Sequence, residues 1–318
     1  QADDEPLAVR TALVRQLVST RYRQDIRRAV AKTACVIGDP STEGYSKHFF
    51  GDSGIPGQTR LVRLRGAVEE ADVVRQTLAK AGYAIRLVEP NASKLDVFKT
   101  LFREPYRILM IAAHGMHNGL RRDGGRRSGV VLSDGIMLTA AELNRMEVVP
   151  DLVFLNCCHL GQVEATPQAY NRLAYSVSRE LIEMGVRCVV AAGWSVDDAA
   201  ACEFARVFFE SLVENNKPFG ESVWEARKAT YEQYRDLNTW GAYQAYGDPS
   251  YRLDHDERDR EESIWNPVSP QELTERLTGL RIAHKHEQAK DHQKTAKKAK
   301  ELLRGVPPAW QDLPEVQF

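Results

Sequence analysis

The strongest constraint on the fold is an alternation of short apolar runs with amphipathic segments along most of the chain. The runs 108–113, 152–156 and 186–192 are almost entirely apolar and have the length of strands. Between them, the segments 67–81 and 199–213 repeat apolar residues at helical spacing. Continuously apolar strands are typical of parallel sheets that are covered on both faces. The sequence therefore predicts an α/β fold with a mostly parallel central sheet sandwiched by helices.

Composition divides the chain into three parts. Residues 1–31 are charged and periodically apolar, which predicts a helical lead-in. Residues 32–253 hold the alternating pattern and form the predicted central domain. After residue 253 a run of charges leads into a polar, helix-favouring stretch. We therefore expect residues 254–318 to form a charged C-terminal helical extension or a linker to a further domain.

Charge, cysteine content and hydropathy exclude several classes of protein. With 43 basic and 44 acidic side chains, the chain lacks the basic excess of a direct nucleic-acid binder. Its cysteines number 5, an odd count that indicates reduced thiols. No apolar run reaches the roughly 18 residues that span a bilayer, and no signal peptide is visible. We expect a cytoplasmic protein that binds neither nucleic acid nor membrane directly.

Two predicted strands end in chemically reactive residues. The run 108–113 ends in His114-Gly115, and the run 152–156 ends in Cys157-Cys158. Because functional groups gather at the carboxyl ends of parallel strands, His114 and one cysteine are expected in the same crevice. A thiol with a pKa of about 8.5 is only about 3% thiolate at neutral pH. An imidazole that takes the thiol proton therefore activates the cysteine. The pattern predicts a cysteine nucleophile with His114 as general base.

A glycine directly after the histidine has a chemical use. Without a side chain, Gly115 lets its backbone N–H approach a reacting carbonyl group. Together with the N–H of the nucleophile Cys158, it would form an oxyanion hole.

Six motifs, in register, resemble the CHAT domain, a caspase-related family akin to separases, gingipains and metacaspases. The motifs occupy residues 36–40, 67–71, 111–115, 153–161, 193–199 and 240–249. Aligned on the glycine of the family's catalytic motif, Cys158 is the nucleophile and Cys157 takes a small residue's place. His114 and Cys158 stand 44 residues apart, near the roughly 50 of caspases. The resemblance implies a caspase-like fold and a cysteine endopeptidase with a Cys158–His114 dyad and no cofactor.

The resemblance also implies where substrate binds. Such proteases hold the substrate as an extended strand against a late segment of the sheet and line a pocket for the residue before the scissile bond. The corresponding places are held by Asp39, Asn156, Trp194, Ser195, Val196, Asp197 and Asp198. A carboxylate at Asp39 favours an Arg or Lys side chain in that pocket. The neutral Asn156 leaves a small or apolar preference open.

The family further implies a regulated role in bacterial signalling or defence. Such proteases are restrained until a partner or a neighbouring domain triggers them, and gasdermin-like pore-forming proteins are among the substrates. A rival interpretation is a catalytically silent, caspase-like scaffold that binds a protein partner. The two differ in whether Cys158 is reactive.

Structural alternatives stay open for several of these residues. Asp39 fits a strand-ending Asp-Pro turn as well as a pocket, and Asp197 fits a helix N-cap. Cys157 is better interpreted as a small core residue, because side chains alternate between the faces of a strand. His114 alone could be a buried histidine with backbone partners, but its context favours catalysis.

A metal site is the remaining alternative for this region. Nitrogen and sulfur ligands for zinc are offered by His114, His117, Cys157, Cys158 and His159. Their spacing fits no standard zinc site, so we expect no bound metal.

Overall fold

An eight-stranded sheet forms the centre of the structure, a computed structural model that describes residues 5–17, 21–23, 26–50, 59–159, 167–254, 267, 269–286, 292–304, 306–312 and 316. The strand order is β10-β9-β8-β4-β2-β3, and β5 and β6 extend the sheet from β4. All neighbours from β9 to β3 are parallel, whereas β10 is antiparallel to β9. The strands are β2 (Thr33–Gly38), β3 (Ala84–Val88), β4 (Ile108–Leu120), β5 (Arg126–Val131), β6 (Met137–Leu138), β8 (Leu152–His159), β9 (Cys188–Ala192) and β10 (Tyr243–Gly247).

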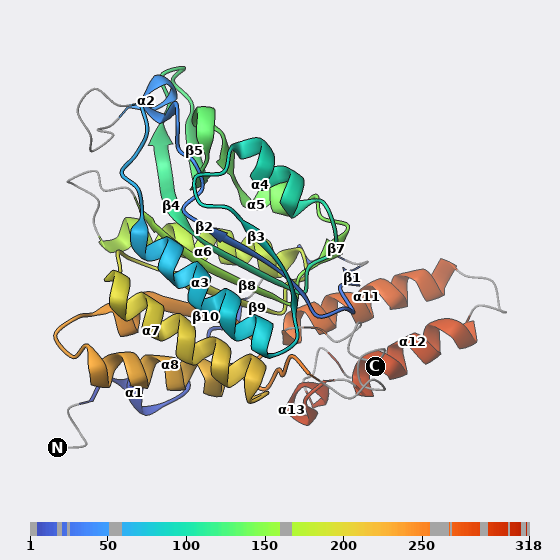
Figure 1. Cartoon of the computed structure of the whole chain (residues 1–318). Coiled ribbons are helices and arrows are strands. Elements are labelled where there is room, and N and C mark those ends of the chain that lie inside the picture. The colour runs from blue at the N-terminus through green and yellow to red at the C-terminus, as the bar shows by residue number, and fades with distance from the viewer. Residues whose placement is uncertain are drawn as a thin grey trace.

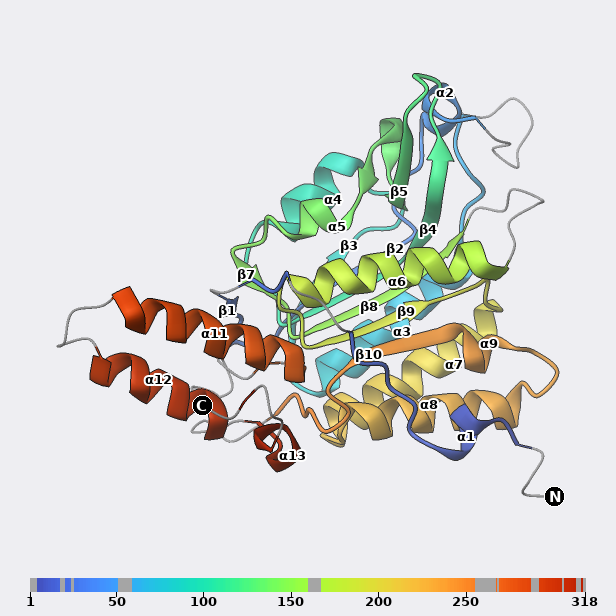
Figure 2. The same ribbon diagram turned by 180° about the vertical axis from the view of Figure 1, so that it is seen from behind.

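Helices cover both faces of this sheet, as Figures 1 and 2 show from opposite sides. One layer consists of α3 (Arg65–Lys80), α7 (Asp198–Phe209) and α8 (Phe219–Gln233). The other consists of α4 (Lys94–Leu101), α5 (Ala140–Leu143) and α6 (Pro167–Glu183). The predicted α/β architecture with a mostly parallel central sheet is confirmed.

The central strand β4 shows why its sequence is apolar without interruption. Met110 and Ala112 pack in the core on the α3 and α7 side, while Leu109 and Ile111 pack in the core on the α6 side. A strand with both faces buried needs apolar side chains at every position. The same rule holds for the neighbouring β8 and β9, which makes these strands the most readable from sequence.

The N-terminal segment differs from its prediction. Its described residues form only the short helix α1 (Leu7–Arg10) and the two-residue strand β1 (Arg27–Arg28), so the helical lead-in predicted for residues 1–31 is wrong in its helical character. Arg15 instead lies extended beside β10, where its N–H donates to Ala245 O at 2.8 Å and its carbonyl accepts from Gly247 N at 3.1 Å. The exposed edge of β10 offers backbone partners that an isolated, marginally stable helix would not gain.

The antiparallel strand β10 has no clear signature in the sequence. Gln244 is buried within it and accepts hydrogen bonds from Arg15 at 3.0 Å and from Tyr246 Oη at 2.5 Å. This buried amide stands second in the strand, so β10 lacks the run of four or more apolar residues with which β4 and β8 begin.

The C-terminal extension is helical, as predicted. It consists of α11 (Pro270–His286), α12 (His292–Arg304) and α13 (Pro308–Gln311). A small separate core holds these helices together, formed by Leu273, Leu277, Leu302, Val306, Trp310 and Val316. None of the described helices combines the length and the apolar character that crossing a membrane requires.

The aromatic centre of the core provides a test of this packing. The ring of Phe154 in β8 lies 5.6 Å from that of Phe208, 5.4 Å from that of Phe209 and 5.6 Å from that of Tyr243. We expect Phe154→Ala to lower the free energy of unfolding by about 3–5 kcal/mol through lost burial and the cavity it leaves. Urea unfolding measures this, with Phe102→Ala as control because Phe102 is 46% exposed. Equal losses in the two variants would contradict this assignment of the core.

Candidate active site

Backbone register brings the two predicted catalytic positions together. In the parallel pair β4–β8, Ala112 lies opposite Asn156, His114 opposite Cys158 and Gly115 opposite His159. Both strands run toward the same carboxyl edge of the sheet, so the expected neighbourhood of histidine and cysteine exists at the level of the backbone. The side chain of Cys158 and residues 160–166 lie outside the described part of the chain.

His114 is held in one orientation by a backbone carbonyl. Its side chain is buried, and Nε2 lies 2.6 Å from the carbonyl oxygen of Val62. Because a carbonyl only accepts, Nε2 carries the proton, and Nδ1 of the neutral ring is then the nitrogen that can take up another. Burial lowers the pKa of His114 below its usual 6.5, outweighing the bond to Val62 and the nearby Asp39, which both raise it. The ring is therefore neutral at neutral pH, as a general base must be.

Gly115 is required by the packing of β4 against β8. A Cβ at this position would lie 2.8 Å from Cys157 O and 3.0 Å from Cys157 Cβ, closer than real contacts allow. The glycine thus has a structural reason that is independent of its predicted place in an oxyanion hole.

Asp39 lies in the strand-ending turn considered from the sequence, and its place in a substrate pocket stays a prediction. It follows β2 with a positive φ of 46° and is 2% exposed, which is the strand-ending turn. Its carboxylate is bonded to Nε of Arg63, whose own side chain is 38% exposed. The carboxylate is thus buried and already paired with a guanidinium group. A substrate cation that reached Asp39 would have to compete with Arg63.

The segment around Val62 and Arg63 contacts two candidate site residues, His114 and Asp39, which the sequence does not signal. Val62 contributes only a carbonyl oxygen, and Arg63 acts through a partner 24 residues away in the chain. Neither contact leaves a motif, because any residue supplies a carbonyl and the ion pair depends on a loop conformation.

Asn156 is committed to a buried carboxyl group on α3. Its Nδ2 donates to Oε2 of Glu70 at 2.6 Å, and both residues are buried. Oε1 of Glu70 has no hydrogen-bond partner among the described residues. Burial raises the pKa of Glu70 from 4.5 to about 8, with a further increase from Asp198. Glu70 is a second residue near the site that sequence reasoning missed, because it resembles any polar position of a surface helix.

The segment after β9 borders the same edge of the sheet. Asp197 caps α7, since its Oδ1 accepts from the N–H of Ala200 at 3.0 Å, as the alternative interpretation had it. Trp194 and Val196 are half-buried and pack against the core on the α3 side, whereas Ser195 and Asp198 are exposed. Exposed and half-buried residues thus alternate in this segment, which follows β9 beside β8.

Cys157 belongs to the opposite face of the sheet. It packs against the core on the α6 side, and its Sγ lies 3.9 Å from Ile111 O. It also lines an apolar cavity together with Val130, Leu143 and Val177. This is the expected core role, on the face that Asn156 does not use. Among the residues that the structure describes, no group of three or more His, Cys, Asp or Glu is arranged to hold a metal ion.

The sheet thus sets the predicted histidine and cysteine opposite each other at the level of the backbone, at the carboxyl edge of its parallel strands. The profile of the CHAT domain matches residues 1–248. The chain therefore belongs to the CHAT domain family, a family of caspase-like cysteine peptidases.

Three solved structures are similar to parts of this chain at low identity. The crystal structure of the Arg-specific cysteine proteinase gingipain R has 15% identity and a TM-score of 0.43, covering 71% of this chain and 50% of that chain. The complex of the Porphyromonas gingivalis RgpB pro- and mature domains has 14% identity and a TM-score of 0.43, covering 70% and 50%. The Saccharomyces cerevisiae separase–securin complex has 13% identity and a TM-score of 0.38, covering 71% and 12%. The chain thus spans half of the length of the two gingipain chains and 12% of the length of the separase–securin chain. No curated protein sequence matches it.

The buried Glu70 predicts a specific pH dependence of stability. The pKa of Glu70 is about 8 in the folded protein against its usual 4.5. The contribution of its protonated form to the free energy of unfolding is therefore fully present below about pH 4.5 and is lost as the pH rises through 8. Glu70→Gln keeps the acceptor for Asn156 and cannot ionise. We expect it to gain up to a few kcal/mol relative to wild type between pH 5 and pH 9.

Urea unfolding of both proteins at the two pH values measures this gain. The control is Glu69→Gln, which alters the exposed neighbouring carboxylate. A Glu70→Gln difference that is the same at both pH values would show that the carboxyl group is ionised in the fold.

Proposed function

We propose that the protein is a cysteine endopeptidase that hydrolyses peptide bonds of protein substrates, with Cys158 as nucleophile and His114 as general base. The observation that carries this proposal is the register of β4 and β8, which sets the backbones of the two residues opposite each other. The tautomer of His114 supports it, because the bond to Val62 leaves Nδ1 to take up a proton.

Strand periodicity supports placing both groups on one face. Ala112 packs toward α3, and His114 follows it by two residues in β4. Asn156 contacts Glu70 of α3, and Cys158 follows Asn156 by two residues in β8. Since a strand repeats every two residues, we expect His114 and Cys158 to act from the same face.

The proposed reaction has two halves. The Nδ1 of His114 takes the thiol proton of Cys158, and the thiolate attacks the substrate carbonyl. Backbone N–H groups of Gly115 and Cys158 bind the resulting oxyanion. His114 then gives its proton to the leaving amine, and a thioester remains. In the second half His114 takes a proton from water, the hydroxide attacks the thioester, and the thiol of Cys158 is regenerated.

We propose that the substrate lies extended along Trp194, Ser195 and Val196, with Asp39 and Asn156 near the pocket for the residue before the scissile bond. Asp197 and Asp198 add negative charge to this side. Arg63 is paired with the Asp39 carboxylate, the group that a substrate Arg or Lys would contact. Binding of such a substrate must therefore displace Arg63. The pair shows that the Asp39 carboxylate accepts a guanidinium group, so we favour a basic residue before the cut.

Family membership supports further parts of the proposal. We infer a regulated bacterial signalling or defence protease that acts in the cytoplasm and is triggered by a partner or neighbouring domain. Its proposed substrates include gasdermin-like pore-forming proteins.

Mapping of new protein N-termini in a host lysate tests the proposed activity. We expect wild type and Cys157→Ala to create the same new termini, whereas Cys158→Ala and His114→Ala lose them by roughly a thousandfold or more. Cys157→Ala is the matched control because its side chain packs on the other face of β8.

Three outcomes would contradict parts of this proposal. Loss in Cys157→Ala but not in Cys158→Ala would reverse the assignment of the nucleophile. New termini after Asp or Leu rather than Arg or Lys would exclude the basic pocket. No new termini, even with a candidate activating partner present, would favour the scaffold.

A further inference from the structure

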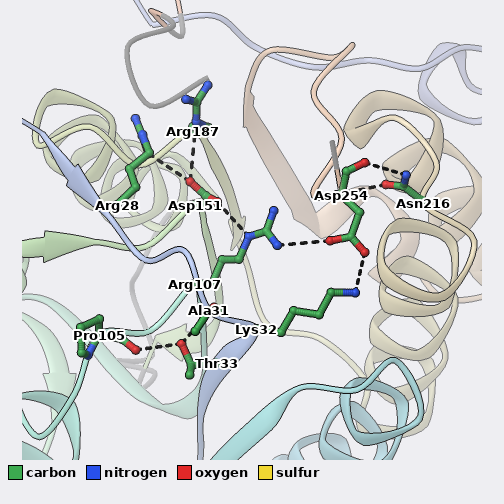
Figure 3. A network of polar contacts seen from close by, with 10 residues as sticks. All are labelled: Arg28, Ala31, Lys32, Thr33, Pro105, Arg107, Asp151, Arg187, Asn216 and Asp254. Atoms are coloured by element: carbon green, nitrogen blue, oxygen red, sulfur yellow. Dashed lines mark hydrogen bonds and ion pairs between the residues drawn. The ribbon is translucent and has the colours of Figure 1, made fainter. Parts of the chain in front are cut away.

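The amino edge of the sheet has a row of charged residues that the proposed proteolysis does not use. Each of these residues stands directly before a strand: Lys32 before β2, Arg107 before β4, Asp151 before β8 and Arg187 before β9. Because these strands are parallel neighbours, the four side chains gather at one edge, opposite to the edge of the candidate active site. Asp254 joins them from the chain after β10 (Figure 3).

Asp151 is shared by three guanidinium groups. Its Oδ1 lies 3.3 Å from Nη1 of Arg28 and 3.6 Å from Nε of Arg187, and its Oδ2 lies 3.1 Å from Nε of Arg107. Arg107 has a second partner, since its Nη1 lies 3.2 Å from Asp254. Arg107 is thus well neutralised, whereas Arg28 and Arg187 depend on one oxygen of Asp151.

Arg28 and Arg187 retain buried N–H groups that make no hydrogen bond to the described residues. Their side chains are only 4% and 5% exposed. Nε and Nη2 of both residues have no hydrogen-bond partner among the described residues. Burial, and next the positive charge of Arg187, lower the pKa of Arg28 to about 10. Adjacent buried cations with unsatisfied donors are costly, and an anion that bridges them would remove the cost.

Among the residues that the structure describes, Asp151 is the ion-pair partner of both arginines, and no second carboxylate pairs with them. Arg187 stacks on the ring of Tyr251 at 5.2 Å, which uses a face of its guanidinium group and not its N–H edges. Glu272 of α11 directs Oε1 to Arg276 at 2.5 Å and acts on Arg28 only as a minor charge. In Figure 3 Arg28 and Arg187 both lie on the side of Asp151 away from Arg107.

We propose that Arg28 and Arg187 form a binding site for an oxyanion of the phosphate class, remote from His114 and Cys158. Two guanidinium forks offer parallel N–H donors, which match the several acceptor oxygens of a tetrahedral phosphate. The bound group would bridge β1 to the start of β9. It is either free phosphate or the phosphate of a small organic molecule.

Thermal unfolding of the full chain in increasing inorganic phosphate, with ionic strength held constant by NaCl, tests this site. We expect a saturable rise in Tm of roughly 3 °C or more. Arg28→Lys and Arg187→Lys keep the positive charge but lose the planar guanidinium group. We expect each variant to raise the half-saturating phosphate concentration at least about tenfold. The control is Arg179→Lys, because Arg179 pairs with Glu183 on the surface.

The remaining outcomes are decisive as well. A response that does not saturate, or that the Arg28 and Arg187 variants share with wild type, overturns the proposal. If a variant does not fold, equilibrium dialysis of the wild-type protein against radiolabelled phosphate replaces the comparison of variants. Absence of saturable binding in that experiment also overturns the proposal. A parallel titration with ATP distinguishes the sources, since the tighter of the two ligands identifies a free or an organic phosphate.

Discussion

The candidate active site depends on the register of two buried parallel strands, β4 and β8. Hydrophobic side chains on both faces hold these strands at the centre of the sheet, and a slip of one residue would move every side chain to the other face. The close approach of Gly115 to Cys157 reinforces the register, because no larger residue fits there. The pairing of His114 with Cys158 at the level of the backbone is therefore a consequence of core packing.

Burial acts differently at the two edges of the sheet. At the carboxyl edge it favours neutral forms, since it lowers the pKa of His114 and raises that of Glu70. At the amino edge, shared ion pairs keep buried groups charged, and the three arginines hold the pKa of Asp151 below its usual value despite burial. A neutral base at the carboxyl edge suits proton transfer. Fixed charges at the amino edge suit the binding of an anion, or hold the first residues of neighbouring strands together.

Much of this arrangement could be predicted from the sequence, for particular physical reasons. Continuous apolar runs predict β4, β8 and β9, because strands buried on both faces leave that pattern. The residues that follow the apolar runs of β4 and β8 identify His114 and Cys158 as candidates, although β4 itself continues past His114 to Leu120. The carbonyl of Val62 and the buried carboxyl of Glu70 could not be predicted, since each acts across a loop or a helix packing. The N-terminal segment differs from the predicted helix because it pairs at Arg15 with the edge of β10, a contact that local sequence does not reveal.

The reactivity of the native cysteines tests the central claim that His114 activates Cys158. Brief treatment with iodoacetamide at pH 6.5, followed by peptide mass spectrometry, gives the alkylation rate of each thiol. Activation predicts that Cys158 reacts at least about tenfold faster than Cys157 and that His114→Ala removes the difference. A Cys158 that reacts no faster than Cys157, or whose rate is unchanged by His114→Ala, would contradict the dyad.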